Sequence, residues 1–241
     1  MAGETLATEA IVLSVRPWSR TSHIVSWLTR DAGRVTTVVK GAVRPKSAFL
    51  GQYDLFYTCE LVYYARQRAG MWIPREISPI ERRDALRGRW RETSLAAYAA
   101  AFAGELAPPD ASSSEWFGLL SRHLDSLCAG TRSMTPDEAL LALARFETSA
   151  LGLAGLAPDF RNADGDGSDM DFAIDSGRPG RGTRTVKISR RAAAVVSGAD
   201  HSPRPAAVRD ALRFLGVFIT YHLERPAAPR RSLVDLLCSV F

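Results

Sequence analysis

Seven basic residues are concentrated between positions 16 and 46, where only Asp31 carries a negative charge. They are Arg16, Arg20, Arg30, Arg34, Lys40, Arg44 and Lys46. Cationic side chains gathered in this way neutralise phosphates and release condensed counterions, which gives salt-sensitive binding that is indifferent to base sequence. The arginine fork can also hold a phosphate through two hydrogen bonds. The stretch therefore predicts a surface that grips a nucleic-acid backbone. The alternative interpretation is a basic face that serves only solubility.

Four aromatic residues lie among or just after these charges, namely Trp18, Phe49, Tyr53 and Phe56. Exposed rings in such a place can stack on bases. Large aromatic side chains more often serve burial in a hydrophobic core. The sequence leaves both interpretations open for each ring.

Local motifs of catalysis are absent from the sequence. There is no G-x-x-x-x-G-K-[ST], no strand-following G-x-G-x-x-G, no G-x-S-x-G and no H-E-x-x-H. The four histidines are too scattered to suggest a ligand set. We therefore expect a protein that is not an enzyme and needs no cofactor.

An aspartate-rich segment tests one metal motif. Asn162, Asp164, Asp166 and Gly167 match positions 1, 3, 5 and 6 of a calcium-binding EF-hand loop. Position 12, which should supply a bidentate glutamate, is Ala173. The segment is therefore expected to be a solvated loop rather than a calcium site.

Composition narrows the class of protein. The chain has 241 residues, 46% of them hydrophobic, a formal net charge of +5 and a pI near 9.4, which favour a folded protein with an anionic partner. Cys59, Cys128 and Cys238 are far apart and odd in number, which argues against a disulfide framework. Neither a signal peptide nor a membrane-length apolar run is present. We expect a cytoplasmic protein without a membrane partner.

The basic stretch falls within a series of strand-like runs rich in β-branched and aromatic residues. We expect strands at Ala10–Val15, His23–Leu28, Arg34–Val39, Leu55–Tyr64 and Met71–Ile77. Short turn-forming links predict hairpins between the first three, and the Gly41–Ser47 run predicts an exposed basic loop after the third. Five strands with uneven links suit a small closed barrel of the oligonucleotide-binding (OB) type, with an SH3-like barrel as the alternative.

From Glu81 the hydrophobic period becomes helical. Helices are expected from about Leu86 to Leu106, and at Ser112–Cys128, Pro136–Leu151, Ser189–Ser197, Pro205–Leu223 and Leu233–Val240. The fold class is therefore α+β, with a five-stranded OB-fold barrel in residues 1–80 and an α-helical domain in residues 81–241. A glycine- and aspartate-rich insertion at 155–185 is expected to form a loop or short ribbon within the helical domain.

Several runs resemble one protein family. Thr29, Gly33-Arg34 and the segment Lys40-Gly41-Ala42-Val43-Arg44-Pro45-Lys46-Ser47 form the pattern T-x-x-x-G-[RK] … K-G-A-x-R-x-K-S. This pattern, with Ala10–Leu13 and His23–Val25, resembles the N-terminal domain of the bacterial RecO family. Weaker similarity continues through Leu151-Gly152, Ala157–Phe160, Tyr221–Leu223 and Arg230-Arg231, which look like the family's helical domain.

The resemblance implies an OB-fold barrel joined to a helical domain, acting in recombinational repair. RecO proteins bind single- and double-stranded DNA, anneal complementary strands, and cooperate with RecR to load RecA onto strands coated by single-strand-binding protein. Many members carry two C-x-x-C pairs that hold zinc just after the position of Pro158-Asp159-Phe160. Here the next residues, 161–167, contain no cysteine, so we do not expect zinc.

The resulting hypothesis is a DNA-binding and strand-annealing recombination mediator. Arg34, Lys40, Arg44 and Lys46 are the expected phosphate contacts, and Arg16, Arg20 and Arg30 are supporting charges. Expected partners are single- and double-stranded DNA, RecR, the C-terminal tail of single-strand-binding protein and, indirectly, RecA, and a protein with these partners is expected at the nucleoid. Two alternatives remain: an adaptor whose helical domain chiefly docks proteins, with Arg122, Arg132, Arg145 and Arg213 as candidate contacts, or a general RNA-binding OB-fold protein.

Overall fold

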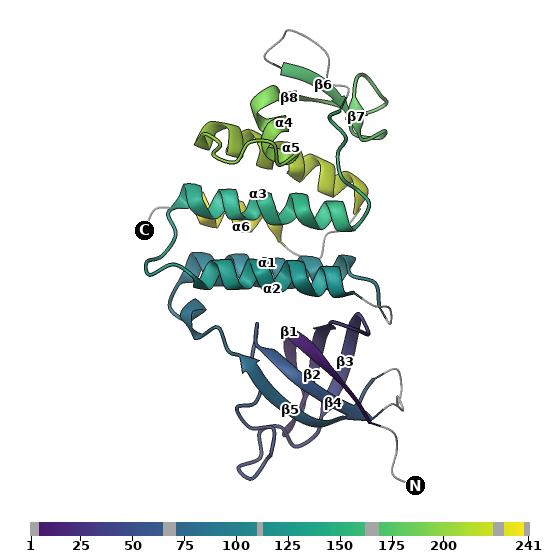
Figure 1. The fold of residues 1–241 in the computed structure, drawn as a ribbon, viewed down its shortest axis with the longest axis vertical. Helices are drawn as coiled ribbons and strands as arrows, with labels where there is room; N and C mark the ends of the chain where they lie inside the picture. Colours follow the sequence, from purple (N-terminus) through teal and green to yellow (C-terminus); the bar gives the residue numbers. More distant parts are fainter. Residues whose placement is uncertain (1–4, 65–70, 110–112, 162–168, 224–228, 239–241) are drawn as a thin grey trace. The chain divides into compact units, whose positions relative to one another are not determined.

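A computed structural model describes residues 5–64, 71–109, 113–161, 169–223 and 229–238 of the chain. The chain forms two compact units, residues 1–130 and residues 131–241. The first unit holds a five-stranded sheet and two long helices, and the second holds four helices and a small three-stranded ribbon (Figure 1). The fold class is α+β, as predicted. The boundary at residue 80 stays a prediction.

The first unit is built on an antiparallel sheet of order β3-β2-β1-β4-β5. Its strands are β1 (Thr5–Ser19), β2 (Ser22–Thr29), β3 (Arg34–Val39), β4 (Thr58–Tyr64) and β5 (Pro74–Glu81). Alternating side chains from all five strands fill one core, as the period of two requires. Within it the Trp27 indole donates to Thr37 Oγ1 at 2.8 Å, so the buried polar groups of both side chains are satisfied.

The two edges of the sheet meet at a single described position and do not form a continuous ladder. Trp72, just before β5, donates to Thr36 O at 2.8 Å and accepts from the Val38 amide at 3.1 Å. The pairing of Trp72 with Thr37 is parallel and isolated. In the described residues, the predicted barrel is therefore a sheet that is not fully closed, and its two edges meet only at this bridge.

Two strands begin later than their patterns predict. β4 starts at Thr58 rather than Leu55, because Phe56 adopts a left-handed backbone with φ of 69° that a strand cannot continue. β5 starts at Pro74 rather than Met71, because Trp72 pairs with β3 instead.

Helices complete the first unit. A short 3₁₀ turn (Asp84–Leu86) precedes α1 (Trp90–Leu106), and α2 (Ser114–Cys128) follows. Gly88, with φ of 85°, separates the turn from the helix. The two helices lie side by side against β1 and β2 (Figure 1).

The second unit contains α3 (Pro136–Leu153), α4 (Arg190–Val196), α5 (Pro205–His222) and α6 (Arg230–Cys238). α3 begins as its sequence predicts. Thr135 Oγ1 accepts from the Glu138 amide at 3.3 Å, and Glu138 Oε2 accepts from the Thr135 amide at 2.7 Å, which completes a capping box before Pro136.

A buried ion pair joins three of these helices. Glu147 of α3 is fully buried, and its two carboxylate oxygens accept from Arg230 of α6 at 2.6 and 2.9 Å. Arg230 also donates to Leu212 O of α5 at 2.8 Å. Removing either Glu147 or Arg230 would leave the other charge buried without a partner, which is strongly destabilising.

The predicted insertion forms a ribbon of order β7-β6-β8, with β6 at Asp169–Ala173, β7 at Arg178–Pro179 and β8 at Thr185–Ser189. Residues 162–168, which include most of the tested EF-hand match, lie outside the described residues.

Candidate nucleic-acid interface

The basic loop at residues 40–47 starts where β3 ends and folds back on itself. Gly41 has φ of 67°, and a Cβ there would lie 3.3 Å from the Arg44 side chain, so glycine suits both the backbone and the packing. The Arg44 amide donates to Gly41 O at 3.1 Å, and the Ser47 amide donates to Arg44 O at 2.9 Å. The loop is thus a series of tight turns that hold its cations in place.

The tip of the β1–β2 hairpin lies against this loop. Gly41 N donates to Ser22 Oγ at 3.3 Å, and Val43 N donates to Thr21 O at 3.3 Å. In the described ladder, β4 pairs with β1 only as far as Ile11, so the hairpin extends beyond it. The loop and the hairpin tip therefore present one continuous surface.

Five of the seven predicted contact residues gather on this surface, which we call the basic face. It consists of Arg16, Arg20, Lys40, Arg44 and Lys46, all exposed. None of the five forms an ion pair with a carboxylate in the described part of the chain. Two of them, Lys40 and Arg44, line a groove of about 470 Å³ together with Trp18 and the hydroxyl-bearing residues of the hairpin turn. Unneutralised cations beside a groove are suited to binding phosphates.

The other two predicted contacts are engaged within the protein. Arg30 forms an ion pair with Glu9 and lies 4.7 Å from the centre of the Phe117 ring of α2. Arg34 donates to Gly104 O of α1, and its amide donates to Pro108 O at 3.3 Å. Both guanidinium groups therefore hold helices against the sheet.

Of the four aromatic residues considered for base stacking, three pack in the protein and one is exposed. Phe56 is buried, and Phe49 and Tyr53 pack against the sheet core. The Tyr53 hydroxyl lies 2.9 Å from His23 Nδ1, and burial raises the pKa of Tyr53 to about 12. Trp18 is 59% exposed and lines the groove. The core interpretation holds for three rings, and Trp18 remains available to a ligand.

Arg83 is a central residue of the first unit that sequence patterns do not indicate. Its guanidinium is buried and donates to Phe56 O at 2.7 Å, Thr58 Oγ1 at 2.8 Å and Asp125 Oδ1 at 2.9 Å. Its backbone is left-handed, with φ of 52°. It thereby ties the start of β4 to α2. The only signal in the sequence is the pair Arg82-Arg83, and two adjacent arginines do not indicate a buried residue.

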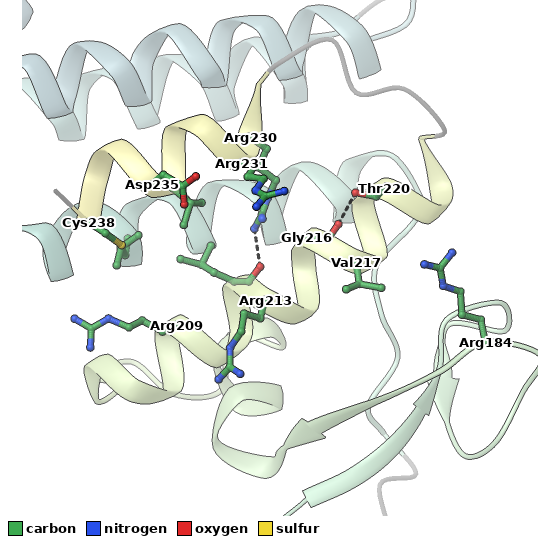
Figure 2. Close-up of a pocket in the computed structure, with 13 residues that line it drawn as sticks. Arg184, Arg209, Arg213, Gly216, Val217, Thr220, Arg230, Arg231, Asp235 and Cys238 are labelled. Atoms are coloured by element: carbon green, nitrogen blue, oxygen red, sulfur yellow. Dashed lines mark hydrogen bonds between the residues drawn. The ribbon is translucent and has the colours of Figure 1, made fainter.

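A second cationic site lies in the second unit. A pocket of about 670 Å³ is lined by apolar side chains of α3, α5 and α6 and by five arginines, with Asp235 as its one acidic lining residue in the described chain (Figure 2). Three of the arginines already pair with a carboxylate, namely Arg209 with Asp137, Arg213 with Asp210 and Arg230 with Glu147. The arginines are Arg184, Arg209, Arg213, Arg230 and Arg231. Figure 2 shows them coming from α5, α6 and the segment before β8.

Of the four arginines that the sequence suggested for partner docking, Arg213 alone lines this pocket. Arg132 forms an ion pair with Glu138 at 2.6 Å, and Arg145 donates to His201 O at 2.8 Å. Arg122 belongs to the first unit. The i, i+4 spacing of Arg209 and Arg213 was the signal available in the sequence, whereas the contribution of Arg230 and Arg231 depends on tertiary packing.

The ribbon does not offer the residues of a zinc site. Its core is aromatic: the Phe172 ring lies 5.0 Å from those of Phe160 and Phe214 and 6.4 Å from Phe218. Within the described residues, no group of three or more His, Cys, Asp or Glu side chains is arranged to hold a metal ion. Residues 155–189 contain no cysteine, so this segment cannot supply the thiolate ligands that the resemblance would require for zinc.

The ends of the ribbon are tied by polar contacts. Asp159 accepts from the Arg161 guanidinium at 2.8 Å and lies 3.9 Å from Arg178, and these arginines hold the pKa of the Asp159 carboxyl well below its usual range. Asp175 accepts from the Thr183 amide at 3.0 Å. The apolar core supplies the stability, since each exposed pair contributes little.

No helix in the described part of the chain combines the length and the apolar character needed to cross a bilayer.

Comparisons with known proteins agree with this architecture. Residues 1–82 match the family "Recombination protein O N terminal", and residues 87–231 match "Recombination protein O C terminal". The protein named DNA repair protein RecO from Anaeromyxobacter sp. (strain K) is 27% identical over 94% of both chains, and that from Anaeromyxobacter sp. (strain Fw109-5) is 29% identical over 97% of both. The protein of the same name from Escherichia coli O139:H28 is 28% identical over 67% of this chain and 63% of its own. The chain therefore belongs to the RecO family of DNA repair proteins, and its N-terminal sheet is that family's OB-fold domain.

Proposed function

We propose that this protein is a DNA-binding and strand-annealing recombination mediator that helps to load a recombinase on single-stranded DNA in recombinational repair. The basic face carries the proposal, because its five cations, with no carboxylate partner in the described chain, lie together on a turn-rich loop and a hairpin tip. Phosphates of one strand could bind there in place of counterions. Membership of the RecO family supports DNA rather than RNA as the ligand.

The proposed DNA contacts are confined to the basic face. Arg30 and Arg34 are given a supporting role instead, because their guanidinium groups already have partners in Glu9 and Gly104. Annealing requires that a strand be held while the hydrogen-bonding edges of its bases remain free to pair. A surface that binds phosphates without reading bases meets this requirement, and no catalytic step is needed.

A second function, docking of a protein partner, is favoured by the arginine-rimmed pocket of the second unit. Its apolar floor and cationic rim complement a peptide that is both acidic and hydrophobic, such as the C-terminal tail of single-strand-binding protein. Arg184 and Arg231 form no ion pair in the described residues, so they are open to a carboxylate. We propose that this pocket recruits the mediator to coated strands, with RecR and, indirectly, RecA as further partners.

An annealing assay with complementary strands coated by single-strand-binding protein tests the proposal. The wild-type chain should accelerate annealing, and the triple variant Lys40→Ala/Arg44→Ala/Lys46→Ala should lose most of that acceleration on naked and coated strands alike. Arg184→Glu/Arg231→Glu should lose it only on coated strands. A wild-type chain that leaves the annealing rate unchanged on both substrates would refute the mediator function. Equal affinity for matched DNA and RNA oligonucleotides would instead favour the RNA-binding alternative.

A further inference from the structure

Trp18 occupies a special position in the β1–β2 hairpin. Pro17 pairs with His23 and Ser19 pairs with Ser22, so Trp18 is the extra residue of a β-bulge. A bulge turns a side chain away from its regular direction, and bulges are common beside functional sites. At 59%, Trp18 is the most exposed large hydrophobic residue of the described chain.

The described fold gives Trp18 no structural task. Trp27 is fully buried in the sheet core, and Trp116 of α2 is buried as well, so the first unit does enclose indole rings where it uses them for stability. A single exposed hydrophobic side chain needs no explanation by itself. Trp18 differs because of what surrounds it.

The residues around Trp18 are of the kinds found in nucleotide-binding sites. The groove that it lines also receives Lys40 and Arg44, and Arg16 and Arg20 flank it in the chain. Its volume of about 470 Å³ lies within the range of sites for small molecules. An aromatic face beside backbone-binding cations is the arrangement by which proteins hold single strands without reading their sequence.

We infer that Trp18 forms a base-stacking subsite, in which the indole takes an unpaired nucleobase while Lys40 and Arg44 hold the adjacent phosphates. The inference rests on the proposed function and deepens it. A base within a duplex is already stacked on both faces and is not offered to the indole. Trp18 therefore makes the basic face prefer single strands, which the charges alone do not.

Binding of three fluorescent probes tests this subsite: an oligothymidylate, an abasic strand of equal length, and a blunt duplex. Trp18→Ala should weaken binding of the oligothymidylate by about 5-fold to about 150-fold, the range expected for one base–aromatic stack. The abasic strand and the duplex have no free base, so their affinities should change by less than about twofold. Trp18→Phe keeps an aromatic face and should restore most of the lost affinity.

A matched control removes a comparable exposed side chain from another part of the same unit. Ile80→Ala in β5, where the side chain is 57% exposed, should leave all three affinities unchanged. Equal urea midpoints for the three variants would show that folding is intact. Unchanged oligothymidylate binding by Trp18→Ala, or an equal loss on the abasic strand, would overturn the subsite while leaving phosphate binding in place. A wild-type chain that binds no probe would refute the proposed function itself, and the subsite with it.

Discussion

The salt dependence of single-strand binding is the most direct measure of the basic face. Each phosphate contact contributes about 0.7 to the slope of log affinity against log salt for a single strand. The face has five cations without an ion-pair partner in the described chain, so the full set predicts a slope of about −3.5. Raising the salt from about 50 mM to about 200 mM should then weaken binding about 100-fold.

Lys40→Ala/Arg44→Ala/Lys46→Ala leaves two of the five cations. Its slope should be about −1.4, and the same rise in salt should weaken binding only about 7-fold. Fluorescence anisotropy of a labelled oligothymidylate, titrated at four or more salt concentrations, measures both slopes. The two lines should converge at high salt, since the difference between the proteins is counterion release.

A control of equal charge change separates contact from net charge. Arg75→Ala/Arg82→Ala/Arg122→Ala removes three exposed arginines of the first unit that lie outside the basic face. This variant should keep a slope within about one of the wild-type value, because the slope counts phosphate contacts. An unchanged slope for the loop variant, or an equal fall for the control, would show that the loop is not the contact surface.

Further outcomes concern stability and metal. Arg83→Met leaves the buried acceptors Phe56 O and Thr58 Oγ1 unpaired and should lower the free energy of unfolding in urea by about 3 kcal/mol. The ion pairs of Arg87 are exposed, so Arg87→Met should cost less than about 1 kcal/mol. Similar losses for the two variants would contradict the role given to burial. Thr135→Ala should cost about 1 kcal/mol, measured in the same way, since it removes the capping box. Hydrogen bonds from Arg132 and Thr135 lower the pKa of Glu138 from 4.5 to about 2. The contribution of Glu138 to the free energy of unfolding is therefore complete above pH 4.5 and is lost as the pH falls toward 2. Acid titration of a Glu138→Gln variant should not show this loss. Chelators should leave the unfolding midpoint unchanged, and Phe172→Ala should lower the free energy of unfolding by about 3 kcal/mol or more; a chelator-sensitive midpoint would indicate a metal after all.

Elements with local signals could be predicted from the sequence. β3 has its predicted bounds, because its β-branched run is closed by glycines on both sides. α3 begins at Pro136, because a threonine cap, a proline and a glutamate at fixed spacing specify a helix start whatever the rest of the chain does. Such signals act within one turn, so they depend little on the packing of distant residues.

Features that depend on distant residues could not be predicted. The delayed start of β4 follows from the left-handed turn at Phe56, whose carbonyl is held by Arg83 from beyond β5. The density of basic residues in the sequence likewise led us to predict Arg30 and Arg34 as DNA contacts together with the other cations. Their partners Glu9 and Gly104 are 21 and 70 residues away in the chain, and periodicity carries no information over such separations.

The same distinction applies to the candidate site. The sequence predicts the loop of Lys40, Arg44 and Lys46, because glycine, proline and like charges mark an exposed turn. It could not separate Trp18 from the neighbouring rings, because exposure depends on the bulge and on the core against which Phe49 and Tyr53 pack.

The aromatic core of the ribbon has a consequence for the conditions under which the protein works. Zinc-bound thiolates are oxidised by peroxide, and a fold that relies on them is lost when the ligands become sulfenic acids or disulfides. Phe160, Phe172 and Phe214 carry no such group. Oxidation of thiols therefore cannot unfold this ribbon, because residues 155–189 contain no cysteine.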